Sequence, residues 1–441
     1  MKRLYIERFY LNRADNEYPM TVRVMLRMKD HVDGQMLADA LKATQLRYPY
    51  LCVKLGVVRD ADGSEHFVYD DNPQPWVLSK GRQPVCLFGE EANEHLLAFS
   101  WWDDCVALDF SHVLIDGDSA YRLLRTLLYE YCQRRYDNHL SREGVWLAGD
   151  VIDEAEWTDP ATLPRPAEIH PLPLPERPKV INLTTEAVSP IAERKEVVRI
   201  RIAEEQLMQQ VRACGATPAT FLSLALARAI ARLHPDSAPS VPTVCLAVNL
   251  RKAIGTPLAH HSMVGGLFLP LGQELTEKTF SEQVKVFRKM VTEQTCPDNL
   301  QAYFWQTQDR MDLMEKLPTI NARHQAFAPV NTLMGQMASC MLSYVGKANL
   351  GAAEQYVKEM VAEADAAYMM VLEASAAGGM FTISFSHRFT DDAYLNAFLD
   401  ELRGQNLTCE IADRHPLQLA PIADYRIKKI SNDEDNRRTT D

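Results

Sequence analysis

The segment from Asp109 to Gly117 contains the residues with the clearest capacity for chemistry. It reads Asp-Phe-Ser-His-Val-Leu-Ile-Asp-Gly, so His112 is followed by Asp116 four residues later and then by a glycine. Histidine is the side chain whose ordinary pKa lets it accept a proton near neutral pH. The spacing therefore indicates that His112 is a candidate general base with an acidic residue close by.

The motif permits two interpretations. Three of the 12 histidines precede an aspartate by four residues, but only His112 and Asp116 continue into a glycine. A buried histidine next to an aspartate that caps a helix would show the same letters, because aspartate is favoured at helix N-termini. The motif alone leaves both the catalytic and the purely structural interpretation open.

The hydrophobic pattern predicts the elements that position this motif. Apolar residues before His112 predict a buried strand, and a helix is expected from Asp118 to about Tyr136. The residues on one face of this helix are Tyr121, Leu124, Leu128 and Tyr131. His112 is thus expected at the end of a strand, directly before a long amphipathic helix.

The length of 441 residues exceeds one typical hydrophobic core and predicts two lobes. Between them, seven prolines in "DPATLPRPAEIHPLPLPERP" exclude a regular helix or a central strand, so this segment is predicted to be an extended linker. We therefore expect an N-terminal lobe at 1–158, the linker at 159–180, a C-terminal lobe at 181–423 and a charged, frayed tail at 424–441.

The composition narrows the class of protein. The net charge of -12 argues against a general nucleic-acid or anionic-membrane role, and 46% hydrophobic residues is ordinary for a globular protein. Nine scattered cysteines without a Cys-x-x-Cys pair are typical of a reducing cytoplasm. The N-terminal residues lack the apolar core of a signal peptide, and no run of 18 apolar residues predicts a membrane span.

A faint internal repeat supports the two-lobe prediction. Residues 109–121, "DFSHVLIDGDSAY", and residues 384–394, "SFSHRFTDDAY", share Phe-Ser-His-x-x-x-Asp followed by Asp, Ala and Tyr. Each segment precedes leucines at helical spacing. In the second copy, Arg388 and Phe389 replace small apolar residues and no glycine follows, so His387 is not expected to be the catalyst.

The motif at His112, directly after Asp-Phe-Ser, resembles the active-site motif of the CoA-dependent acyltransferase superfamily. That superfamily includes chloramphenicol acetyltransferase, the condensation domains of peptide synthetases, alcohol acetyltransferases and the plant BAHD enzymes. Three further segments are similar to parts of this superfamily and follow in the expected order. Asp33–Leu55 is similar to its opening helix, and Met341–Lys347 is similar to its serine-containing strand. Between them, Val244–Arg251 with Ser262–Leu271 is similar to its central strand and Asn-Leu-Arg corner.

The resemblance implies an α/β (α+β) fold of two chloramphenicol-acetyltransferase-like lobes, each a mixed sheet flanked by helices, with a tunnel between them. It implies that His112 is the general base, that Asp116 pairs with Arg251 and has a structural role, that Gly117 provides a turn and that Ser343 is a candidate oxyanion donor. It also implies acyl-CoA as a co-substrate, with no permanently bound cofactor and no metal.

Three functions remain open on the sequence. The favoured one is transfer of an acyl group from acyl-CoA to a small-molecule alcohol or amine. An acyl carrier protein could supply the acyl group instead, or the chain could be a non-catalytic binding member of the same fold. The plant branch is disfavoured because its Asp-Phe-Gly-Trp motif is missing here, and His260–His261 is interpreted as a loop pair because no third metal ligand accompanies it.

Overall fold

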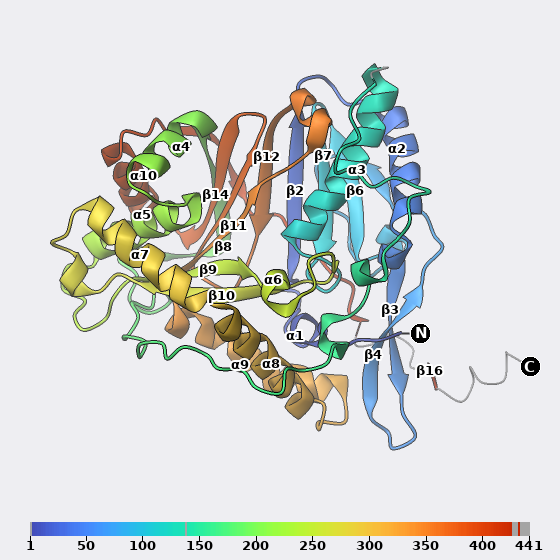
Figure 1. The fold of residues 1–441 in the computed structure, drawn as a ribbon, viewed down its shortest axis with the longest axis horizontal. Coiled ribbons are helices and arrows are strands. Elements are labelled where there is room, and N and C mark those ends of the chain that lie inside the picture. The colour runs from blue at the N-terminus through green and yellow to red at the C-terminus, as the bar shows by residue number, and fades with distance from the viewer. Residues whose placement is uncertain (1, 137–138, 426–430, 433–441) are drawn as a thin grey trace, which may run out of the picture.

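The computed structural model describes residues 2–136, 139–425 and 431–432, whose strands form three sheets. Two of the sheets are the centres of two lobes that lie side by side (Figure 1). The third is a small sheet at the edge of the first lobe, in the order β1 (Lys2–Arg3), β4 (Glu65–Asp71), β3 (Val53–Arg59) and β16 (Ser431–Asn432).

The first lobe contains a sheet in the order β12-β2-β7-β6-β5, and helices α2 and α3 pack on it through a shared apolar core. The strands are β2 (Thr21–Met28), β5 (Leu78–Lys80), β6 (Leu97–Trp102), β7 (Cys105–Ser111) and β12 (Val357–Ala364). The first helices are α1 (Arg8–Leu11), α2 (Gly34–Arg47) and α3 (Gly117–Tyr136). The predicted strand and helix on either side of His112 are therefore both present, as β7 and α3.

Local sequence signals explain where the helices of both lobes begin and end. Asp33 caps α2 by accepting hydrogen bonds from the backbone of the second and third residues that follow it, and the helix ends before Pro49, as expected. Helix α5 (Pro218–Leu233) begins after Thr217 with a reciprocal capping box to Thr220. Both boundaries follow from residues that contact only their own neighbourhood.

The second lobe contains a sheet in the order β10-β9-β11-β13-β14-β8-β15. Its strands are β8 (Ile191–Ala203), β9 (Thr243–Asn249), β10 (Val264–Pro270), β11 (Cys340–Lys347), β13 (Met370–Ala377), β14 (Met380–Phe389) and β15 (Glu410–Pro416). One face is apolar and packs on α4 (Glu204–Ala213), α5 and α10 (Ala393–Gly404). Figure 1 shows these helices on the side away from the first lobe.

The other face of this sheet is polar and meets β12. Arg199 and Arg201 on β8 form ion pairs with Glu363 and Glu359 on β12, respectively. The hydroxyl of Ser375 on β13 donates to the backbone of β12. The polar residues on alternate positions of β8, β13 and β14 therefore face the junction between the lobes, where charges need partners from the opposite side.

The proposed division of the chain needs one correction. Strand β12 lies within the predicted C-terminal lobe at 181–423, but it hydrogen-bonds β2 and completes the sheet of the first lobe. Strand pairing between residues so distant in the sequence depends on tertiary packing, which the local pattern does not contain. Of the predicted tail, Tyr425 packs in the first lobe's core, whereas 426–430 and 433–441 lie outside the described residues.

The proline-rich linker runs along the outside of the second lobe beside α8 (Pro297–Met314) and α9 (Ile320–Met337), as Figure 1 shows. Residues 163–179 form no helix or strand and are mostly exposed, in agreement with the prediction. The remaining helices are α6 (Arg251–Ile254) and α7 (Phe280–Gln294).

No single helix in the described ranges is long and apolar enough to cross a membrane. Helices α4 and α5 meet the length and composition limits only as a pair, across an 82° bend.

Candidate active site

His112 follows β7 directly and lies in the short loop before α3, where its backbone N–H donates to the carbonyl of Met20 at 2.8 Å. Its imidazole Nδ1 lies 3.2 Å from the hydroxyl of Ser262, which comes from the second lobe. Tyr10 stacks on the ring with centroids 5.5 Å apart. The side chain is partly exposed. Contacts from both lobes therefore hold the ring without enclosing it fully.

The surroundings of His112 favour the neutral imidazole. Burial lowers its pKa below the ordinary value of 6.5, and the negative charge of Asp116 opposes that shift only in part. A neutral imidazole at pH 7 is the form that can accept a proton. The electrostatics thus suit a general base.

Asp116 and Arg251 form a buried bidentate ion pair across the lobe junction, with N–O distances of 2.7 and 2.8 Å. The carboxylate also accepts hydrogen bonds from the backbone N–H groups of Ser119 and Met263. Burial acts to raise the pKa of Asp116, but Arg251 and these N–H groups bring it below its usual value. Asp116 is therefore a permanent anion that fastens the start of α3 to the second lobe, and it is not available to move protons.

Arg251 is itself held on several sides. Its guanidinium donates to the backbone carbonyls of Ala259 and His261 at 2.9 and 2.8 Å and to the Ser119 hydroxyl at 3.0 Å. A planar guanidinium with five N–H donors suits such a site, and a lysine would leave several acceptors unpaired. The pair thus fixes the loop that presents Ser262 to His112.

Gly117 differs from the expectation that it provides a turn. It is the first residue of α3, and its φ is not among the positive values that favour glycine. The constraint is space, because a Cβ built on Gly117 would lie only 2.5 Å from Cγ2 of Val345 on β11. The glycine allows a strand of the second lobe to pass close to the start of α3.

We expect Gly117→Ala to lower the free energy of unfolding by about 1–3 kcal/mol, because an added methyl must displace packed atoms. The contact is with one side chain, so Val345→Ala in the same chain is expected to recover most of the loss. Denaturant titration of the single and double variants measures both effects. A Gly117→Ala variant as stable as wild type, or one that Val345→Ala fails to rescue, would contradict this account.

Ser343 lies on β11 opposite Glu373 of β13, and its hydroxyl hydrogen-bonds the Glu373 carboxyl. The hydroxyl that contacts His112 belongs instead to Ser262. No motif in the sequence predicted Ser262 or Tyr10 as a site residue. Ser262 begins the segment Ser262–Leu271, which resembles part of the superfamily's central region. Nothing in the residues around Tyr10 indicates that it lies beside His112, because this position depends on tertiary packing.

The pair His260–His261 is buried and has protein partners. Nδ1 of His261 lies 2.6 Å from a carboxylate oxygen of Glu7, which raises the pKa of this histidine despite its burial. Nδ1 of His260 lies 2.9 Å from the backbone carbonyl of Glu156. These contacts anchor the loop that carries Ser262.

A pocket of about 450 Å³ opens at the lobe junction next to Gly117. The first lobe lines it with Tyr48, Asp118, Tyr121, Arg122, Arg125, Gly144 and Trp146, and the second with Pro257, Leu258, Val345, Lys347 and Asn349. Arg125 donates only to the carbonyls of Gly144 and Asn349, and no carboxylate in the described part of the chain pairs with it. The pocket therefore presents positive charge at its rim.

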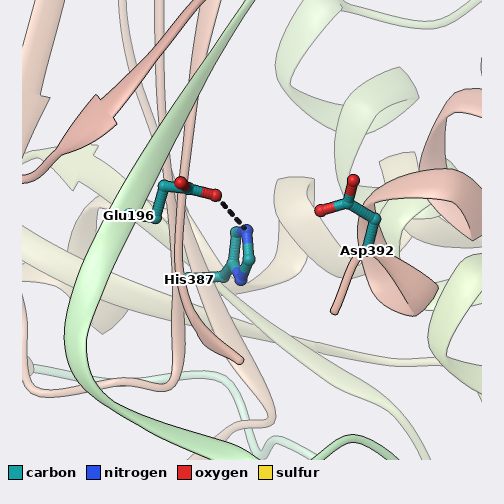
Figure 2. Close-up of side chains that lie close together, drawn as sticks. All are labelled: Glu196, His387 and Asp392. Carbon is teal, nitrogen blue, oxygen red and sulfur yellow. Dashed lines mark ion pairs between the residues drawn. The ribbon is translucent and has the colours of Figure 1, made fainter. Parts of the chain in front are cut away.

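His387 occupies the position in the second lobe that the internal repeat suggests, near the end of β14 and ahead of α10. Figure 2 shows that Glu196 points toward its ring while Asp392 lies to one side. One ligand atom from each of the three residues lies within 4.8 Å of the others, which is close enough for a metal ion.

Two contacts disfavour a metal at this cluster. The guanidinium of Arg414 bonds both carboxylates, at 2.5 Å from Glu196 and 2.8 Å from Asp392, and already supplies positive charge. Nδ1 of His387 accepts a hydrogen bond from the backbone N–H of Phe389, so the ring proton lies on Nε2, the nitrogen that a metal would require. We interpret the cluster as an ion-pair network.

Comparison with solved structures finds the same fold in proteins of very different sequence. Polyketide synthase associated protein 5 from Mycobacterium tuberculosis matches with a TM-score of 0.57 at 13% identity, over 91% of this chain and 97% of that one. F. sporotrichioides TRI101, solved with coenzyme A and T-2, matches with a TM-score of 0.56 at 12% identity, over 92% and 98%.

The condensation domain of the Monacolin K polyketide synthase MokA matches with a TM-score of 0.54 at 14% identity, over 92% of this chain and 96% of that one. No protein-family model and no curated protein sequence matches the chain. The likeness extends over both lobes. The chain therefore has the two-lobe fold seen in TRI101 and in condensation domains.

Proposed function

We propose that this protein moves an acyl group from a thioester donor, with acyl-CoA favoured, to a hydroxyl or amine of a small molecule. The observation that carries the proposal is His112 itself, a partly exposed imidazole at the lobe junction whose pKa is lowered and whose Nδ1 is bonded to Ser262. The fold adds support, because its relatives include a protein solved with coenzyme A.

The hydroxyl of Ser262 lies 3.2 Å from Nδ1 of His112. We assign the Nδ1–H to this contact, so the lone pair on Nε2 is the proposed base. A residue from the opposite lobe thereby positions the ring.

In the proposed reaction, Nε2 takes the proton from the acceptor hydroxyl or amine as that group attacks the thioester carbonyl. The carbon–sulfur bond then breaks, and the imidazolium returns the proton to the departing thiolate. Ser343, the expected donor to the tetrahedral oxyanion, gives its hydroxyl hydrogen to Glu373 here, so the proposed reaction assigns no oxyanion donor. No covalent enzyme intermediate is needed. The Asp116–Arg251 pair holds the loop with His112 and the loop with Ser262 in fixed positions relative to each other.

The pocket beside Gly117 is the proposed mouth for the donor. The guanidinium of Arg125, which has no carboxylate partner among the described residues, suits the phosphates of coenzyme A, whereas Arg122 is paired with Asp118. The condensation-domain neighbours support a second candidate donor, an acyl group on a carrier protein. A cytoplasmic location is proposed as well, supported by nine cysteines that all lie in described residues and are all free thiols.

The test follows free-thiol release from a panel of acyl-CoA donors in the presence of mixed alcohols and amines. Release that depends on the acceptor supports an acyl-CoA-dependent transferase. Release only from an acyl carrier protein would move the function to the condensation type. No release from either donor would favour a non-catalytic binding protein.

The pH profile of kcat/KM is expected to report the lowered pKa of His112. The base form persists to more acidic pH than for a free histidine, so activity should fall on the acid side only at a lower pH than a free imidazole would give. A His387→Ala variant should give the same profile. An acid limb with its midpoint at or above the free-histidine pKa of about 6.5 would contradict a lowered pKa.

A further inference from the structure

Three polar residues form a row across the second lobe's sheet. Ser343 on β11 lies opposite Glu373 on β13, and Glu373 lies opposite Ser384 on β14. Residues directly opposite each other point to the same face of a sheet, with Cβ atoms about 4.5–5.5 Å apart. The next row, Leu342, Leu372 and Phe385, lies in the apolar core under the helices. The polar row therefore points the other way, toward the lobe junction.

Contacts of neighbouring residues place this row beside the candidate active site. Val345, two residues after Ser343, packs against Gly117 at the start of α3. Tyr121, one turn further along α3, lies near enough to Glu373 that the two groups interact electrostatically. Tyr121 also lines the pocket at the lobe junction. Glu373 therefore lies near Tyr121, one of the residues that line this pocket.

Glu373 is partly exposed, and the part of the chain that the structure describes supplies it with no cation. The buried carboxylates of Asp109, Asp116, Glu359 and Glu363 lie opposite Arg23, Arg251, Arg201 and Arg199. For Glu373, the described residues provide a hydrogen bond from Ser343 but no arginine, lysine or histidine within ion-pair distance. A carboxylate in such a place is costly unless something compensates its charge.

Ser384 provides an independent observation. Its side chain is 2% exposed, and its Oγ has no hydrogen-bond partner among the described residues. A buried hydroxyl without a partner is uncommon in folded proteins and calls for an explanation. Here it flanks an unpaired carboxylate, so a ligand could satisfy both groups at once.

We propose that Ser343, Glu373 and Ser384 together bind a primary ammonium group of the acceptor. An ammonium has three N–H donors and a positive charge, which matches two hydroxyl oxygens and one carboxylate. The inference rests on the proposed acyl transfer and narrows its substrate class. The acceptor is an amino alcohol or a diamine, with a charged amine at this row and a free nucleophile at His112.

The electrostatics of Glu373 predict how binding depends on pH. Burial raises the pKa of Glu373 to about 7, and the hydrogen bond from Ser343 opposes the shift. The groups that face it are Ser343 from β11, Ser384 from β14 and Tyr121 from α3. Arg199 of β8 lies opposite Ser384 in the same row and is paired with Glu363 of β12. Because an ammonium favours the ionised carboxylate, its affinity should rise as the pH increases through 7, and binding at pH 7 should release about half a proton.

Calorimetry with simple probes tests the site without requiring turnover. We expect n-butylammonium to bind the wild type, and n-butanol and butyltrimethylammonium to bind at least about tenfold more weakly, because they lack the charge or the N–H donors. Glu373→Gln and Ser384→Ala should each weaken the binding of n-butylammonium by a similar factor. Titrations in two buffers of different ionisation enthalpy measure the released protons.

The matched control is Ser386→Ala. Ser386 is also a buried serine on β14 without a hydrogen-bond partner, but it lies opposite Val371 rather than Glu373. The Ser386→Ala substitution should leave the binding of n-butylammonium unchanged. Equal binding by wild type and Glu373→Gln would overturn the proposal, and so would equal binding of n-butylammonium and n-butanol.

Turnover distinguishes this inference from the proposed function. With a series of amino alcohols and neutral alcohols of matched length, Glu373→Gln should lower kcat/KM for amino alcohols by about tenfold or more and leave neutral alcohols unaffected. Ammonium binding without any acyl transfer would refute the proposed function and keep the site. Acyl transfer to neutral alcohols with no ammonium binding would refute the ammonium site and keep the proposed function. A Glu373→Gln effect confined to the KM for the donor would also overturn the proposed site.

Discussion

Replacement of His112 by alanine is expected to lower the rate of acyl transfer by about 10²–10⁴-fold, the usual contribution of a positioned general base. The partly exposed side chain is not a core residue, so the fold should persist and the donor should still bind. Stopped assays of thiol release at saturating donor measure the change in kcat. Donor binding by calorimetry separates lost chemistry from lost affinity.

His387→Ala is the matched control for this experiment, because His387 occupies the corresponding position in the second lobe and has no contact with His112 among the described residues. Its loss should disturb only the local network with Glu196 and Arg414. A comparable loss of activity in both variants would show that the effect is structural. Full activity in His112→Ala would remove the base from the mechanism.

Replacement of Arg251 by alanine is expected to lower the free energy of unfolding by about 3–5 kcal/mol, because it leaves the Asp116 carboxylate buried without its cation. Both side chains are 3% exposed, so water cannot take over the lost contacts. The loop with Ser262 should also lose its anchor, and activity should fall with stability. Denaturant unfolding followed by far-UV circular dichroism measures the first effect.

The double variant Asp116→Asn with Arg251→Met separates the charge from the packing. Removing both charges avoids the uncompensated anion, so the double variant should be less destabilised than the sum of the two single variants. Additive losses would contradict a coupled ion pair.

The pH dependence of the Arg251→Ala defect gives a second check. In the wild type the pKa of Asp116 is lowered, so the pair's stabilisation is present above the ordinary carboxyl pKa and is lost only as the pH falls through the lowered value. Without Arg251, burial dominates and raises the pKa of Asp116. The variant should therefore recover part of its deficit relative to wild type as the pH decreases toward 5.

Much of the secondary structure could be predicted because its signals are local. The strand before His112, helix α3 after it and the start of α5 at Thr217 depend on side chains a few residues apart. The extended linker followed from proline chemistry alone. The resemblance of the motifs supplied the two-lobe fold, which comparison with solved structures supports over 92% of the chain.

The sequence by itself thus determined the candidate base, the elements on either side of it and the division into two lobes. Only the tertiary structure decided that β12 joins the first sheet, that Ser262 contacts His112, and that Gly117 is required for close approach to Val345. It also showed that no cation among the described residues pairs with Glu373. Such contacts join residues that are distant along the chain, and their geometry depends on how whole sheets pack, which no local pattern of side chains encodes.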